Sequence, residues 1–167
     1  MKEAAAVAAL ALAMTAAAAA PGLRCALEAP ARVAAGAVVP LRFSLTNTGA
    51  APLMVLRWNS PFEGAWFAAF VTVTRDGRAV GYQGPMKKRS EPRADHYVHL
   101  DPGATTRAQV ELGQAFDIAR PGRYHVVPHI ELIDVFDATP PLPALPRETL
   151  EGFSLSCPPV DVIVTPR

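Results

Sequence analysis

Four histidines are the first residues of this sequence that could do chemistry, by binding a metal. His96 and His99 lie three residues apart, and His125 and His129 lie four apart. A spacing of four on a helix lets two histidines bind one zinc ion. A proline and valines around the second pair favour a strand instead, where the two side chains lie about 13 Å apart. Val126 also occupies the position where the zinc-protease motif needs glutamate. We therefore predict ordinary surface or edge histidines and no metal site.

Other residue types that support catalysis are equally scattered. No serine lies in the glycine-flanked turn that exposes a hydrolase nucleophile. Glu131, Asp134 and Asp137 form a small acidic cluster, but the spacing and glycine of a calcium loop are missing, so we expect a solvated edge. A glycine-rich phosphate loop is absent from the sequence as well. The sequence predicts a protein that is not an enzyme and carries no cofactor.

A short basic run lies in residues 83–90, a segment bounded by proline. Lys87, Lys88 and Arg89 are adjacent there and follow Pro85 and Met86. Such a run could reach into an acidic site on a partner, or it could simply be solvated, and composition alone favours solvation. The formal net charge of the chain is +1, with acids and bases interspersed. This balance argues against nucleic acid or an anionic membrane as the main partner.

Two cysteines, Cys25 and Cys157, lie near opposite ends of the chain. In an oxidising compartment we expect them to form a disulfide, which could stabilise the fold by about 4–5 kcal/mol. Two unpaired buried thiols are the alternative. Lipidation of Cys25 is not expected, because Leu23 and Arg24 occupy positions where a lipoprotein signal has small residues.

The N-terminus has the layout of a secretory signal. Lys2 precedes an Ala-rich apolar stretch over residues 4–20, which ends in small residues suited to cleavage. The stretch is too short and too weakly apolar to be a membrane span. We predict a signal peptide over residues 1–20, a single domain over residues 21–167, and export to the periplasm or the medium, with no membrane attachment after cleavage.

The remaining chain is a series of short segments of alternating polarity separated by turn residues, which predicts an all-β protein. Residues 39–47 alternate with a period of two, and the apolar residues 53–57 are typical of a central strand. Asp76-Gly77 predicts a hairpin turn, and Tyr124 after a Pro-Gly turn resembles the tyrosine corner of immunoglobulin-like domains. Further strands are expected at residues 23–29, 70–74, 78–82, 97–100, 106–112 and 160–165. Loops are expected at residues 84–95 and 138–152. We predict an immunoglobulin-like antiparallel β-sandwich of seven to nine strands.

Five segments, in order, are more specific than a generic sandwich. They are LRWNSPFEG (56–64), VTRDG (73–77), YQGPMKKR (82–89), DHYVHLDPG (95–103) and FDIARPGRY (116–124). Together they resemble the N-terminal, prosegment-like region of bacterial lysine-specific metalloendopeptidases of the deuterolysin (aspzincin) type. In that family the region precedes a zinc-binding domain with a His-Glu-x-x-His helix. This chain has no such motif, so no catalytic or metal residue carries over. The matching loop residues carry over as a pattern only, and they are Tyr82, Gly84, Pro85, Lys88 and Arg89.

The resemblance implies a non-catalytic exported module that binds a secreted metallopeptidase as an inhibitor or folding assistant. Lys87 or Lys88 would then occupy a lysine-selective pocket. An immunoglobulin-like adhesion or scaffold module and a truncated remnant of a full-length peptidase are alternatives, with a histidine-based metal carrier a more distant one. The candidate partner-binding residues are Tyr82, Gly84, Pro85, Met86, Lys87, Lys88 and Arg89.

Overall fold

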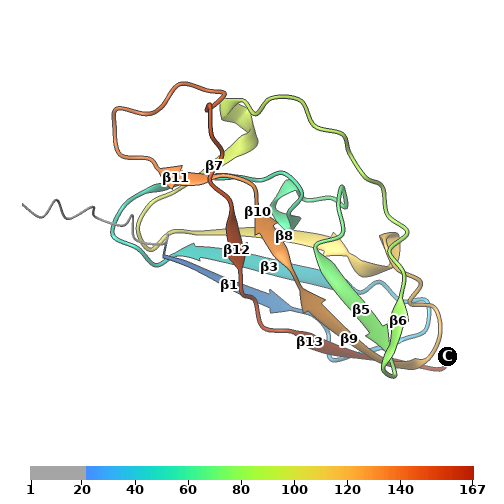
Figure 1. Cartoon of the computed structure of the whole chain (residues 1–167). Coiled ribbons are helices and arrows are strands. Elements are labelled where there is room, and N and C mark those ends of the chain that lie inside the picture. Colours follow the sequence, from blue (N-terminus) through green and yellow to red (C-terminus); the bar gives the residue numbers. More distant parts are fainter. Residues whose placement is uncertain (1–21) are drawn as a thin grey trace, which may run out of the picture.

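Alternating burial along the strands builds the first sheet of the computed structural model, which describes residues 22–167. In β3 (Pro40–Asn47), Leu41, Phe43 and Leu45 are buried while Arg42 faces solvent. This strand lies between β1 (Leu23–Glu28) and β8 (Thr105–Glu111), and both pairings are antiparallel (Figure 1). The predicted period of two in residues 39–47 is confirmed.

A five-stranded sheet faces the first one. Its strands, in spatial order, are β2 (Arg32–Ala34), β13 (Val160–Thr165), β9 (Gly122–Pro128), β5 (Val71–Arg75) and β6 (Arg78–Val80). All neighbours are antiparallel except β2 and β13, which are parallel. Asp76 and Gly77 form the turn between β5 and β6 with φ of 49° and 79°, so the predicted hairpin is confirmed.

The two sheets share one apolar core. The Phe43 ring meets the Phe70 ring edge-on at 5.9 Å, and Trp66 stacks on Phe70 at 4.4 Å. Tyr124 is fully buried, and its hydroxyl donates a hydrogen bond to the Arg120 carbonyl oxygen at 2.8 Å, which is the geometry of a tyrosine corner. The predicted all-β, immunoglobulin-like antiparallel sandwich is confirmed.

Two smaller sheets complete the fold. β4 (Leu53–Leu56) is the central strand between β11 (Val135–Asp137) and β7 (Tyr97–Leu100), as its apolar sequence predicts. β10 (Ile130–Leu132) pairs with β12 (Phe153–Leu155). A second apolar cluster forms around β4, β7 and β11, and its residues are Leu56, Trp58, Tyr97 and Phe136.

The described residues contain thirteen strands, more than the seven to nine expected. The additional strands, such as β2, β10, β11 and β12, have three residues each, which is too few to show an alternating pattern. Three 3-10 helices complete the secondary structure: η1 (Pro61–Glu63), η2 (Ala94–His96) and η3 (Leu112–Gln114). Within residues 22–167, no helix is long and apolar enough to span a membrane. The signal peptide predicted over residues 1–20 lies outside the described residues.

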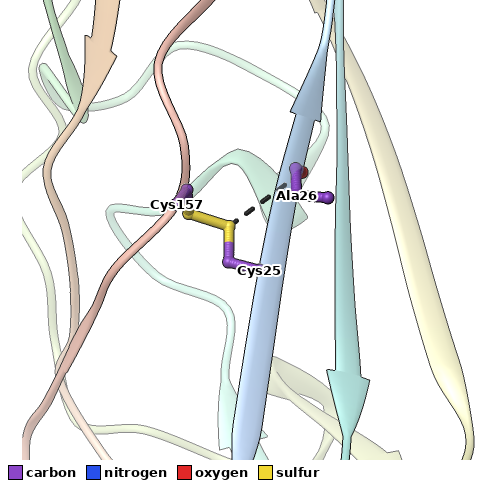
Figure 2. The surroundings of a disulfide bond; sticks show 3 residues. All are labelled: Cys25, Ala26 and Cys157. Atoms are coloured by element: carbon purple, nitrogen blue, oxygen red, sulfur yellow. Dashed lines mark hydrogen bonds between the residues drawn. A yellow bond between two sulfur atoms is a disulfide. The ribbon is translucent and has the colours of Figure 1, made fainter.

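A buried disulfide joins Cys25 in β1 to Cys157, which lies between β12 and β13 (Figure 2). The two Cα atoms are 4.9 Å apart, within the usual range for a disulfide. The bond thereby links the first sheet to the segment that enters the second sheet. The predicted pairing is confirmed.

Candidate partner-binding loop

The segment that sequence reasoning singled out begins at an aromatic anchor. Tyr82 forms an isolated β-bridge with Phe116, and its ring packs against the rings of Phe116 and Trp66. The Tyr82 hydroxyl donates a hydrogen bond to the Pro85 carbonyl oxygen at 2.7 Å, and burial raises the pKa of this hydroxyl. A Cβ atom at Gly84 would lie 2.5 Å from the Tyr82 hydroxyl oxygen, so a larger residue at this position would displace the Tyr82 ring. These contacts fix where the loop starts.

Arg89 anchors the other end of the loop. Its Nη2 atom donates to Glu63 Oε2 at 2.5 Å and to Asn59 Oδ1 at 3.2 Å. Its guanidinium also lies over the rings of Trp58 and Phe67, with centroid distances of 5.2 and 5.6 Å. Only 13% of the Arg89 side chain is exposed. The structure thus places Arg89 in the body of the protein, where it positions the loop.

The partners of Arg89 come from a short, tightly held turn. Ser60 accepts a hydrogen bond from the Phe62 amide and caps η1, and Asn59 adopts a φ of 55°. Glu63 Oε2 also accepts from the Asn59 amide at 2.9 Å, so one carboxylate serves both the turn and Arg89. Sequence reasoning did not include Asn59 or Glu63 among the candidate residues. The signal available was their place in segment 56–64, which is one of the five segments that carry the family resemblance.

Between these anchors, residues 85–88, here named the 85–88 loop, are exposed. The Lys87 amide donates to the Phe67 carbonyl oxygen at 3.1 Å, and Lys87 Nζ lies 4.8 Å from the centroid of the Phe67 ring. The Met86 side chain is 82% exposed. Lys88 makes no ion pair with any residue in the described part of the chain. The loop therefore presents Met86 and Lys88 to solvent, while Lys87 packs against Phe67.

The four histidines do not converge on one site. His125 Nδ1 is 2.9 Å from Asp161 Oδ1, and His129 Nε2 is 3.0 Å from the Ala69 carbonyl oxygen. His96 Nδ1 accepts from the Arg93 amide. Within residues 22–167, no group of three or more histidine, cysteine or acidic side chains could hold a metal ion.

Asp134 is the residue for which the sequence-based expectation is wrong. It was expected on a solvated acidic edge, but it is fully buried. It accepts hydrogen bonds from the Tyr97 hydroxyl at 2.8 Å, from Arg147 Nη1 at 2.5 Å and from the Glu151 amide at 2.9 Å. Burial, and next the bond to Asp134, raise the pKa of Tyr97 far above its usual value. The partners of Asp134 are distant in sequence, so the local spacing of acidic residues could not reveal them.

Comparison with known proteins gives a partial match. No family model matches this chain. A protein named extracellular protease from Aeromonas hydrophila is 34% identical over 88 residues, which cover 53% of this chain and 25% of that protein. The chain thus matches only about a quarter of the length of this relative.

Two solved structures of one domain match this chain at low identity. They are a crystal structure, in complex with di-metal ions, and a solution structure of the CARDB domain of a Pyrococcus furiosus protein. Their TM-scores are 0.33 and 0.32, each with 14% identity. The matches cover 86% and 82% of this chain, and 94% of the domain in both cases.

Proposed function

We propose that residues 21–167 act as one exported, non-catalytic module that binds a secreted metallopeptidase as an inhibitor or folding assistant. The 85–88 loop is the contact element, and Lys88 enters an acidic pocket of the peptidase. The observation that carries this proposal is that the loop is held at both ends while its centre is exposed.

Preorganisation supports the proposal, because a loop already fixed in shape loses little conformational entropy on binding. Tyr82 and Arg89 fix the two ends, and the Lys87 amide adds a third attachment to Phe67. A run of bases that is merely solvated needs no such bracing.

The side chains that the loop presents are suited to a cleft. Met86 offers a flexible apolar contact surface, which adapts to irregular pockets. Lys88 offers an ammonium group that is not paired with an acid among the described residues, so binding an acidic pocket breaks no existing ion pair. Lys87 is the less suitable of the two lysines, because its ammonium group already lies over the Phe67 ring.

Export has support that does not depend on the loop. A buried disulfide is typical of proteins that leave the reducing cytoplasm. The similarity to part of an extracellular protease fits a module related to secreted peptidases. The dispersed histidines fit a binding role better than zinc catalysis, which needs three protein ligands around one ion.

The proposal is tested by titrating a deuterolysin-type peptidase from the producing organism with the purified protein. We expect binding and a change in peptidase activity or refolding yield at micromolar concentration. Absence of binding together with absence of both effects would sink the proposal.

A further inference from the structure

The outward face of the β1–β3–β8 sheet carries three exposed arginines. Strand register places Arg24 opposite Thr46, Arg107 opposite Ser44, and Arg42 between Glu28 and Gln109. All three arginines lie on the side of the sheet away from the core. We name this surface the arginine face, and its residues are Arg24, Glu28, Arg42, Ser44, Arg107 and Gln109.

The arginine face keeps a net positive charge, because its three arginines outnumber its one acid, Glu28, which lies opposite Arg42. Arg24, Arg42 and Arg107 form no ion pair there, and Arg42 makes one hydrogen bond, from Nε to Gln109 Oε1 at 3.1 Å. By contrast, the side chains of Arg89, Arg93, Arg123 and Arg147 all pair with acids. Glu28 is the acid within the face.

The acid at the border of the face is already engaged. Glu111, at the end of β8, accepts hydrogen bonds from the Gly113 and Val39 amides at 2.8 and 3.2 Å. Its charge is directed at the backbone and away from the arginines. The three guanidinium groups therefore retain donors for an external anion.

Arg42 and Arg107 are placed to hold an anion together. They lie on neighbouring strands as diagonal neighbours on the same face, a position that separates two residues by about 7–8 Å. Ser44 lies beside both, and the three residues line one depression together with Glu28 and Gln109. Guanidinium groups bind sulfate or phosphate oxygens through paired N–H donors. The face thus combines anion-binding groups with serine and glutamine side chains that can hydrogen-bond to hydroxyls.

The chemistry of the face also discriminates between classes of polyanion. Each large apolar side chain exposed in the described residues lies outside β1, β3 and β8. A protein interface needs apolar or aromatic anchors, a lipid surface needs apolar groups that insert, and single-stranded nucleic acid needs aromatic rings for stacking. A sulfated or phosphorylated sugar chain needs only cations and hydrogen-bonding groups.

We infer that the arginine face binds an anionic polysaccharide, with Arg42 and Arg107 holding one sulfate or phosphate group and Arg24 a second. Ser44 and Gln109 bond to the sugar hydroxyls between them. This inference does not depend on peptidase binding, because the 85–88 loop lies outside β1, β3 and β8.

The test measures binding of the protein to dextran sulfate by isothermal titration calorimetry at 50 and 150 mM NaCl, with unsulfated dextran alongside. We expect salt-dependent binding of dextran sulfate and none of dextran. The variant R42Q/R107Q should weaken binding by about tenfold or more, because two charge-assisted contacts are lost.

The matched control is R32Q/R78Q, which removes the same charge from exposed arginines on β2 and β6. We expect it to change the affinity by less than about twofold. If R42Q/R107Q does not fold, R24Q/R107Q replaces it, since neither of these side chains makes a hydrogen bond in the described structure.

Three results would overturn the inference. The first is no binding of dextran sulfate, and the second is an equal loss of affinity in the R42Q/R107Q and R32Q/R78Q variants. The third is poly-glutamate binding through these arginines more tightly than dextran sulfate, which would assign the face to an acidic protein. If the wild-type protein binds dextran sulfate but does not bind the peptidase, the proposed function is refuted and this inference is not.

Discussion

The Arg89 guanidinium donates to the Glu63 carboxylate at 2.5 Å, across 26 residues of sequence. This pair is where the basic loop and the η1 turn meet, and both side chains are largely shielded from water. A residue that sequence reasoning placed among the presented bases is therefore an anchor. The distinction matters because it leaves Lys88 as the lysine free to engage a partner.

Replacing Arg89 should destabilise the protein, whereas replacing Lys88 should not. Arg89→Ala leaves Glu63 without its cation, and we expect the free energy of unfolding to fall by about 2–3 kcal/mol. Lys88→Ala removes an exposed side chain and should change it by about 0.5 kcal/mol or less. Urea unfolding of both variants measures the difference. Equal stability of the two variants would show that the anchor is not formed.

Removing the charge of the buried Asp134 should also destabilise the protein. Asp134→Asn removes the charge that Arg147 faces at 2.5 Å, so we expect a loss of about 3 kcal/mol. Tyr97→Phe removes only one of the hydrogen bonds to Asp134 and should cost about 1–1.5 kcal/mol. Amide hydrogen exchange at Glu151, which donates to the same carboxylate, should accelerate in Asp134→Asn. Unchanged exchange at that amide would contradict the assigned network.

Breaking the disulfide should lower the free energy of unfolding more than any of the substitutions above. The bond between Cys25 and Cys157 spans a sequence separation of 132. The chain-entropy relation then gives a loss of about 4–5 kcal/mol in the double variant C25A/C157A. The measurement is the urea midpoint of the double variant against that of the oxidised protein. A midpoint within error of the oxidised protein would show that the bond contributes little.

The contribution of Asp161 to stability should depend on pH. Hydrogen bonds, first from Arg123 and next from His125, lower the pKa of the Asp161 carboxyl from 3.8 to about 2. Because the pKa is lower in the folded state, this stabilisation is present above about pH 4 and is lost as the pH falls toward 2. The stability difference between the wild type and Asp161→Asn should therefore be larger at pH 5 than at pH 2.5. Equal differences at the two pH values would contradict this ion pair.

The strands that sequence patterns could predict are those with enough residues to show a period. The alternation from Leu41 to Leu45, the Asp76-Gly77 turn and the Pro-Gly turn before Tyr124 all carry local signals, and the structure confirms each. The three-residue strands β10 and β11 do not, because their pairing depends on distant partners.

The candidate site shows the same limit. The basic run from Lys87 to Arg89 is visible in the sequence, but which base is presented depends on Glu63 and Phe67, which lie in an earlier segment of the chain. Asp134 was missed for the same reason, since Tyr97 and Arg147 reach it only through the fold. Residue type suggested the loop, and only tertiary contacts assign roles within it.

The most direct measurement is the affinity of the protein for a deuterolysin-type peptidase of the producing organism, with wild type, Lys88→Ala and Arg78→Ala compared. Arg78 is an exposed base on β6 and serves as the matched control. We predict micromolar or tighter binding by the wild type and by Arg78→Ala, and binding weaker by about tenfold or more for Lys88→Ala. No binding by the wild type, or equal binding by all three proteins, would contradict a partner-binding role for the 85–88 loop.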